Sequence, residues 1–453
     1  MAAPSNSDSS CRLTPAPALS PPGRALNRRR FLARSAALTL GATPIAHAVA
    51  GPAIFTTRKT PAVLQVALLA TEVRKHSHAQ HFIDRLLEGY GWQGRHYRPN
   101  LRLVSLYVDQ FPEGDLARER SQRHQVKIYP TLSEALTRGS SRLAVDGVLI
   151  IAEHGKYPRN EKGQTLYPRY KFYKETVRVF EASGRSVPVF NDKHLSTNWA
   201  ECQEMVQDSR RLGFAFLAGS SLPVTWRIPD VELALGTRLE ESVCLGYGGV
   251  DSYDFHGLET AQCMSERRRS GESGVRAIHA VRGDTVWTML QQHESTLQLF
   301  FAALTRSHTV RPPPGFAWLP PTLDSARRAA KAPVAYFIEH NDRFRTTMFL
   351  LNGFVQDFTY AGRISGGKIA SCQMHLPMPN HISSTADFFN PLMYNIEQTI
   401  VNRRTPYPIE RTLLTSGMTL SSVESLHRGQ IRVETPELNV AYRGAAAPAH
   451  WRA

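Results

Sequence analysis

Short apolar runs alternate with helical patterns from residue 62 to residue 218. The runs that we predict as strands are 62–70, 101–109, 126–129, 145–152, 187–190 and 214–218. Helical spacing is found in 79–88, 167–182 and 199–212, between several of these runs. Nearly continuous Val, Leu and Ile are typical of strands that are covered on both faces. The pattern therefore predicts an α/β fold with a doubly wound parallel sheet, the Rossmann arrangement.

The pattern changes after residue 220. Apolar runs at 334–339, 346–351 and 354–360 follow one another without a helical pattern between them. Strands in direct succession favour a mixed or antiparallel sheet, so we predict an α+β domain with a large open sheet. The predicted organisation is a leader over residues 1–50, a Rossmann domain over 60–220, the α+β domain over 221–440 and a loose tail over 441–453.

The first 50 residues resemble a twin-arginine export signal. Arg28, Arg29 and Arg30 precede Phe31-Leu32, and an apolar stretch then leads to a small-residue cleavage pattern at 46–48. The apolar stretch at 35–50 is too short to span a bilayer comfortably, which disfavours a membrane anchor. We therefore expect the chain to engage the twin-arginine translocation machinery and to work in the periplasm. Substrates of that pathway cross the membrane folded, often with a cofactor already bound.

The formal net charge is +15, and it falls by five to +10 without residues 1–48, which hold six arginines and one acid. The remaining positive charge is scattered, with no basic helix and no aromatic RNA-binding signature, so we predict no nucleic-acid partner. An anionic or polyhydroxylated ligand is compatible with this charge. The four cysteines beyond the leader have no tight spacing, and we predict neither a zinc site nor a disulfide framework.

Polar side chains stand where predicted strands end. Thr71 follows the first strand, Asp109 ends the second, His154 comes just after the fourth, and Lys193 and His194 follow the fifth. Ligands of open parallel sheets bind outside the carboxyl ends of the strands. We therefore expect these side chains to lie at one ligand site.

Three segments resemble the Gfo/Idh/MocA oxidoreductases. The passage 128–158 (IYPTLSEALTRGSSRLAVDGVLIIAEHGKYP) is similar to their third-to-fourth strand region. The segment 187–196 (VPVFNDKHLS) is similar to the segment that carries their catalytic lysine, and 247–259 (YGGVDSYDFHGLE) to their second catalytic segment, in which an Asp and a His follow glycines. The weaker resemblance extends over about residues 62–440.

This resemblance implies a Rossmann domain joined to an α+β domain and an NAD(P)-dependent oxidoreductase of sugars, polyols or related carbonyls. It implies NAD or NADP as the cofactor, with Thr71, Asp109, His154 and Lys193 as cofactor-binding residues. Asp109 suits the ribose hydroxyls of NAD. It also implies a homo-oligomer, because the family often buries the open sheet face between subunits. The glycine-rich turn of the family is missing, since no glycine lies between Leu69 and His81.

The expected chemistry is hydride transfer, which requires that the hydroxyl proton leaves as the carbonyl forms. A histidine can accept that proton, and a lysine ammonium can stabilise the negative charge that develops on the oxygen. We assign these catalytic roles to His256 and Lys193, with Asp251 assisting. Asp254 could orient His256 instead of Asp251, and we also place Asp254 with His194 as substrate-binding residues.

Three alternatives stay open. The fold could serve an exported, non-redox sugar-binding or scaffolding protein, or an NAD-dependent glycosidase. A metal-dependent hydrolase is a third possibility, because His76, His78 and His81 follow the first predicted strand, as in many enzymes built on β/α barrels. The preferred interpretation assigns no metal ligand.

Overall fold

The computed structural model describes residues 63–311, 321–378 and 385–451. These residues belong to one compact unit that runs from residue 61 to residue 453. The predicted export signal and its cleavage site lie outside the described residues. In the described part of the chain, no helix is long and apolar enough to cross a membrane.

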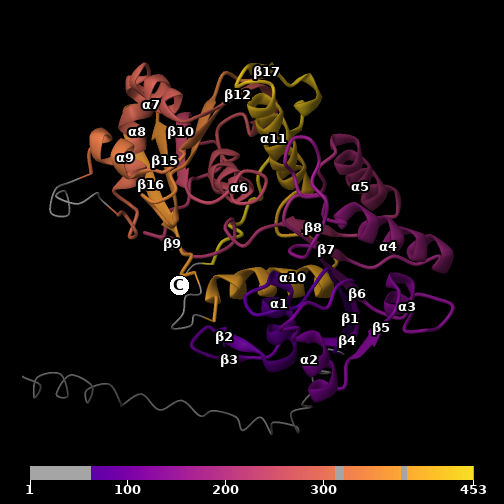
Figure 1. Cartoon of the computed structure of the whole chain (residues 1–453). Helices are drawn as coiled ribbons and strands as arrows, with labels where there is room; N and C mark the ends of the chain where they lie inside the picture. Colours follow the sequence, from indigo (N-terminus) through magenta and orange to yellow (C-terminus); the bar gives the residue numbers. More distant parts are fainter. Residues whose placement is uncertain (1–62, 312–320, 379–384, 452–453) are drawn as a thin grey trace, which may run out of the picture. The chain divides into compact units, whose positions relative to one another are not determined.

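The first sheet has six strands, and all of its neighbouring strands are parallel. Its order is β5-β4-β1-β6-β7-β8, so the chain starts in the middle, moves to one edge and returns to build the other (Figure 1). This is the doubly wound Rossmann order, and it confirms the predicted α/β class. The strands are β1 (Leu64–Ala70), β4 (Leu101–Val108), β5 (Lys127–Tyr129), β6 (Gly147–Ile151), β7 (Val189–Asp192) and β8 (Phe216–Gly219).

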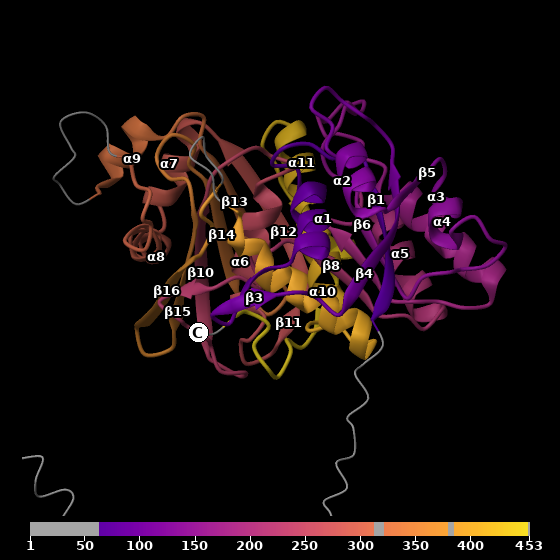
Figure 2. The same ribbon diagram turned by 90° about the horizontal axis from the view of Figure 1, so that it is seen from below.

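Helices cover both faces of this sheet, as its apolar strands require. Alternate residues of β1 point to opposite sides: Ala67 and Leu69 pack with one set of helices, and Val66 and Leu68 pack with the other. The first set is α3 (Leu132–Thr137), α4 (Arg169–Ser183) and α5 (Trp199–Arg211). The second set is α1 (His78–Glu88) and α10 (Asn390–Asn402), which lie next to each other in both ribbon views (Figure 1, Figure 2).

We did not expect α10 to pack on the first sheet, because its sequence lies in the predicted α+β domain. The guanidinium of Arg85 in α1 donates to Asn390 Oδ1 at 2.8 Å and to the carbonyl oxygen of Ala386 at 2.6 Å. A Cβ on Gly147 would come within 2.8 Å of Ile400, so α10 approaches β6 very closely. The first sheet is therefore completed by residues that come some 170 positions after its last strand.

The second sheet has eight strands in the order β17-β12-β13-β14-β10-β15-β16-β9. Only β10 and β14 are parallel neighbours, which confirms the predicted mixed sheet. The strands are β9 (Arg227–Ile228), β10 (Leu239–Gly246), β12 (Val275–Arg282), β13 (Val334–His340), β14 (Arg345–Leu350), β15 (Phe358–Ile364), β16 (Lys368–Met374) and β17 (Arg432–Glu434).

Both faces of the second sheet are covered by the chain's own helices. One face packs on α6 (Asp254–Ser265) and α11 (Ile409–His427). The other packs on α7 (Asp284–Gln291) and α8 (Glu294–Leu304), with α9 (Leu323–Ala329) beside them. The mixed sheet is as predicted, but α7 and α8 pack on the face that we expected a second subunit to cover. The oligomeric state itself stays a prediction.

Smaller elements complete the described fold. They are β2 (Tyr90–Trp92), β3 (Arg95–Tyr97), α2 (Ala117–His124), β11 (Glu272–Ser273), β18 (Ala441–Tyr442) and two short 3-10 helices, η2 (Asp387–Phe389) and η3 (Pro436–Leu438). The four cysteines Cys202, Cys244, Cys263 and Cys372 are buried and free.

The end of the chain is not the loose tail that we predicted, as far as it is described. His450 is buried and lies 2.9 Å from Asp230 Oδ1 and 2.9 Å from Glu232 Oε2. The ring of Trp451 packs on that of Trp92, with 4.2 Å between their centroids. Aromatic packing and a buried histidine therefore hold this segment against the body.

Helix α11 lies between the two sheets (Figure 1) and is bonded to both sides. Near its start, Thr412 Oγ1 donates to the carbonyl oxygen of Ala218 in β8 at 2.7 Å. Arg411 forms a bidentate, buried ion pair with Glu266, at the end of α6, at 2.8 and 2.5 Å. One turn further on, Ser416 Oγ accepts the backbone N–H of Leu195. Helix α11 thus fixes α6 relative to the ends of β7 and β8.

We expect Arg411→Met to lower the free energy of unfolding by about 3–5 kcal/mol, because it leaves the Glu266 carboxylate buried without its cation. Urea denaturation measures the change. The matched control is Arg327→Met, which removes an exposed ion pair with Asp284 and should cost less than about 1 kcal/mol. A loss at Arg411 no larger than at Arg327 would contradict the importance of the buried pair.

Candidate active site

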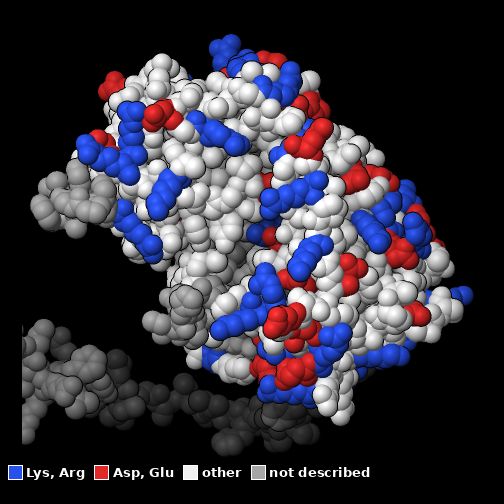
Figure 3. Space-filling view, viewed as in Figure 1, with Lys and Arg blue, Asp and Glu red and all other residues white. Residues whose placement is uncertain are grey.

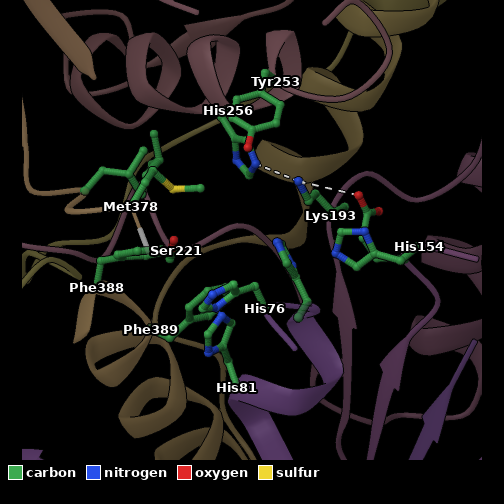
Figure 4. A pocket seen from close by; sticks show the side chains of 14 residues that line it. His76, His81, His154, Lys193, Ser221, Tyr253, His256, Met378, Phe388 and Phe389 are labelled. Carbon is green, nitrogen blue, oxygen red and sulfur yellow. Dashed lines mark hydrogen bonds and ion pairs between the residues drawn. The ribbon is translucent and has the colours of Figure 1, made fainter. Parts of the chain in front are cut away.

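A pocket opens where the carboxyl ends of β1, β6 and β7 face α6, and Figure 4 shows the side chains that line it. Its empty space is about 690 Å³, a figure that includes space open to solvent. The lining combines five histidines, a lysine, a glutamate and several apolar or aromatic side chains. These residues are His76, His78, His81, Glu153, His154, Lys193, Ser221, Leu222, Tyr253, His256, Leu376, Met378, Phe388 and Phe389.

Lys193 is placed by the end of β7. Its backbone is in the left-handed region, with φ 69°, and its N–H donates to the carbonyl oxygen of Gly219 at the end of β8. A Cβ on Gly219 would lie 2.4 Å from Glu259 Oε1, so glycine allows β8 to approach α6 closely. The turn of the backbone directs the Lys193 side chain into the pocket although it is 3 % exposed.

Lys193 meets His256, which lies in the first turns of α6. Lys193 Nζ is 2.6 Å from His256 Nε2, and a dashed line marks this contact in Figure 4. Burial, reinforced by the Lys193 ammonium, holds the pKa of His256 well below its usual value, so the imidazole is neutral. Because Lys193 can only donate, Nε2 accepts and Nδ1 carries the proton. Nδ1 is buried and has no hydrogen-bond partner among the described residues.

Glu153, which sequence reasoning missed, is the anionic partner of Lys193. Its Oε1 lies 3.6 Å from Lys193 Nζ, and its Oε2 accepts from Arg169 Nη2 at 2.6 Å. Burial favours the neutral acid, but the two cations outweigh it and hold the pKa of Glu153 well below its usual value. The available signal was an acid directly after the fourth predicted strand, beside His154.

His194 lies behind the pocket wall rather than in it. It is buried, and its Nε2 lies 3.0 Å from Arg169 Nη1. Burial, and then Arg169, hold its pKa well below the usual value. His194 can therefore orient Arg169, but it does not line the space where a substrate would sit, which argues against the predicted substrate contact.

The two aspartates also differ from expectation. Asp251 accepts from Gln164 Nε2 at 2.8 Å, while Asp254 accepts the N–H groups of residues 251, 252 and 255 and the hydroxyl of Tyr336. Within the described chain, neither has a hydrogen bond or ion pair with His256. The expectation that one of them orients His256 is thus wrong for this structure, because both are used to fix the loop before α6. Asp254 is fully buried and does not line the pocket.

The predicted cofactor residues lie along the carboxyl edge of the first sheet, but only His154 and Lys193 line the pocket. Thr71 is buried, and its hydroxyl donates to the Glu153 carbonyl oxygen at 2.7 Å. Asp109 is exposed, and its two oxygens accept from Tyr107 at 2.7 Å and Tyr157 at 2.6 Å. His154 Nε2 is buried with no hydrogen-bond partner in the described chain, and burial lowers its pKa to about 3.

Several backbone N–H groups in the turn from β1 to α1 and at the start of α1 donate hydrogen bonds to side chains of the same segment. The N–H of Arg74 and that of Gln80 both donate to Ser77 Oγ, and the N–H of His76 donates to Gln80 Oε1. This turn has residues with side chains at the place where the Gfo/Idh/MocA oxidoreductases, which the sequence resembles, have a glycine-rich turn. The loops after β4 and β6 are also joined, because Gln110 exchanges two hydrogen bonds with the backbone of Lys156.

The three histidines of the metal-hydrolase alternative all line the pocket. His78 Nδ1 lies 2.7 Å from Asp192 Oδ2, and the rings of His78 and His81 each pack on Phe389 at 5.0 Å. Burial lowers the pKa of His81 to about 3. Among the residues that are described, no group of three His, Cys, Asp or Glu side chains is arranged to hold a metal ion. The Phe388-Phe389 wall carried no signal in the sequence.

No protein-family model matches the chain, and no curated protein matches its sequence. Solved structures with a similar fold include the following two. GenD2 from gentamicin A biosynthesis, in complex with NAD, is 11% identical with a TM-score of 0.51, over 87% of this chain and 99% of GenD2. The myo-inositol dehydrogenase from Lactobacillus casei, in complex with NAD(H) and myo-inositol, is 10% identical with a TM-score of 0.50, over 82% of this chain and 96% of that enzyme. The likeness to these structures and the two sheets described above confirm the fold that the sequence resemblance implied, a Rossmann domain joined to an α+β domain.

Asp251 should make the free energy of unfolding depend on pH. Burial raises its pKa to about 7, from 3.8 in an unfolded chain. The folded protein therefore keeps a proton that the unfolded chain loses, and the stabilisation, complete at low pH, is lost as the pH rises toward 7. We expect stability to fall by about 1.4 kcal/mol per pH unit from this group between about pH 4.5 and 6.5. Asp251→Asn should remove that slope in urea denaturation.

The control for this measurement is Glu161→Gln, because Glu161 is exposed. It should leave the pH dependence unchanged. A wild-type slope equal to that of Asp251→Asn would show that Asp251 is ionised in the folded protein.

Proposed function

We propose that this chain is an NAD(P)-dependent oxidoreductase that acts by hydride transfer on a sugar, a polyol or a related carbonyl compound. The observation that carries the proposal is the buried contact of 2.6 Å between Lys193 Nζ and His256 Nε2 inside a pocket at the carboxyl edge of a Rossmann sheet. The shared fold with GenD2 in complex with NAD and with a myo-inositol dehydrogenase in complex with NAD(H) supports it. In this proposal the enzyme is exported and works in the periplasm, as residues 1–50 suggest.

The residues of the chain can manage the proton that hydride transfer releases. A carbinol oxygen that enters between Lys193 Nζ and His256 Nε2 would accept a hydrogen bond from the ammonium and give its proton to the neutral imidazole. As negative charge develops on that oxygen, the ammonium stabilises it in a buried, weakly screened setting. Glu153 and Arg169 hold the lysine in place through their own ion pair.

The residues at this edge of the first sheet suit the nicotinamide end of a dinucleotide better than they suit its pyrophosphate. A bound nicotinamide would supply the hydride acceptor, and His154 and Lys193 would hold it at the pocket, with Asp109 available to ribose hydroxyls. His154 Nε2, buried and unpartnered among described residues, supports a polar ligand there. The pyrophosphate would meet the glycine-free turn, where side chains rather than backbone amides must bind it.

One observation favours a second candidate, a non-redox sugar-binding protein on the same fold. The hydrogen bonds from Tyr157 to Asp109, and between Gln110 and Lys156, tie the acid expected at the ribose hydroxyls to the loop after β6. A pocket that keeps its Lys193–His256 contact could then bind a ligand without a dinucleotide.

Nucleotide binding separates the two candidates. Protein purified from cytoplasm without added nucleotide and then denatured should release NAD or NADP, identified by absorbance and mass spectrometry. Added NAD should stabilise the emptied protein by about 2.7 kcal/mol at one hundred times its Kd. No released nucleotide together with no thermal shift in millimolar NAD or NADP would leave the non-redox candidate.

Catalysis tests the pocket itself. In a screen of sugars and polyols followed by NADH absorbance, we expect Lys193→Ala and His256→Ala each to lower kcat by about 100- to 10,000-fold, because each removes one partner of the proton transfer. Lys171→Ala, which changes an exposed lysine of α4, is the matched control and should keep full activity. An equal kcat in Lys193→Ala and in the control would show that Lys193 does not take part in the reaction.

A further inference from the structure

A groove continues from the pocket toward solvent. It shares His76, Tyr253, Leu376 and Met378 with the pocket, so the two spaces have a common wall. Figure 4 shows His76, Tyr253 and Met378 around the space in front of Lys193 and His256. A ligand whose reacting carbon lies at Lys193 can therefore extend into this groove.

Two cations line the groove, one from each half of the fold. Lys75 comes from the turn between β1 and α1, and Arg311 from the segment after α8. Arg311 is held in place, because its N–H donates to the carbonyl oxygen of Phe354 at 2.7 Å and its Nη2 donates to Gln356 Oε1 at 2.7 Å. The space-filling view shows Lys and Arg side chains on both sides of the hollow between the two halves (Figure 3).

The described lining of the groove contains no Asp or Glu. Neither Lys75 nor Arg311 has an ion pair with a carboxylate anywhere in the described chain. The pocket behind them has Glu153 as its one lining acid, and that carboxylate already pairs with Lys193 and Arg169. Lys75 and Arg311 thus bring positive charge to a groove whose described lining supplies no carboxylate to pair with it.

We propose that the groove binds the anionic group of the substrate, so that the substrate is a sugar acid or a sugar phosphate rather than a neutral polyol. This inference rests on the proposed function, which places the reacting carbon of the substrate at Lys193. It adds the chemical class of the group at the opposite end of the substrate. An arginine fork and a lysine are the side chains that bind carboxylate and phosphate most strongly. Tyr253 on the shared wall offers a hydroxyl and a ring face to the sugar between the two ends.

A dinucleotide pyrophosphate is a second source of the same chemistry. The groove is formed partly by Tyr247, Arg311 and Gln356 of the second half, whereas a Rossmann pyrophosphate lies over the turn of the first half. This position favours the substrate as the source. The test therefore needs ligands of both kinds.

The test is calorimetric titration of the full-length protein with inorganic phosphate, 6-phosphogluconate, myo-inositol and ADP-ribose. The variants are Lys75→Ala and Arg311→Ala, with the exposed Lys171→Ala and Arg142→Ala as matched controls. We expect 6-phosphogluconate to bind at least about tenfold more tightly than myo-inositol, and each groove variant to weaken it by about tenfold. The difference in affinity between 6-phosphogluconate and myo-inositol should shrink in 1 M salt, because Lys75 and Arg311 are both exposed. The controls should bind as the wild type does.

Three results would overturn the inference: no binding of either phosphate or 6-phosphogluconate, equal affinity for the neutral polyol, or unchanged affinity in both groove variants. Loss of ADP-ribose binding in Lys75→Ala and Arg311→Ala, with 6-phosphogluconate unaffected, would assign the groove to the dinucleotide instead. Titration with NADH tests the proposed function separately. Binding of 6-phosphogluconate that depends on Lys75, with no NADH binding, would reject the redox function and keep the anionic ligand.

Discussion

The contact between Lys193 and His256 depends on how α11 joins the two halves of the fold. Lys193 belongs to the edge of the first sheet and His256 to a helix on the second, so no local sequence constraint brings them together. The bonds of Thr412 to β8 and of Arg411 to the end of α6 set the spacing between these elements. A buried bidentate ion pair suits this task, because its geometry is narrow and its loss is costly. The chemistry of the pocket is therefore specified by a helix that contributes no side chain to it.

Charge in the pocket is arranged around one carboxylate. Glu153 holds Lys193 and Arg169, and Arg169 in turn lies against His194, so these two buried cations share one buried carboxylate. In a weakly screened interior this leaves the site electropositive. Burial holds the pKa values of His154, His194 and His256 below their usual value. At the same edge of the sheet, the loops after β4 and β6 are hydrogen-bonded to each other, and the turn from β1 to α1 contains no glycine.

Much of the fold could be predicted from the sequence because strands buried on both faces carry a local signal. The runs predicted at 62–70, 101–109 and 145–152 correspond to β1, β4 and β6. The pairing of Lys193 with a histidine of the second half followed from short segments that resemble a family. The roles expected of Asp251 and Asp254 failed because a spacing does not show where a carboxylate points. Residues such as Glu153 and Phe389 were missed because distant segments decide whether they face the pocket.

The position of α10 has a consequence for how the protein is made. One face of the first sheet is closed by a helix that emerges from the ribosome after residue 402, long after β8 is complete. The N-terminal half therefore cannot reach its native core while it is being synthesised, although domains commonly fold in order from the N-terminus. Until α10 arrives, the apolar surface of α1 and β1 stays exposed and needs protection from aggregation. Folding of the two halves is coupled in time as well as in space, and a fragment that ends after β8 lacks part of its own core.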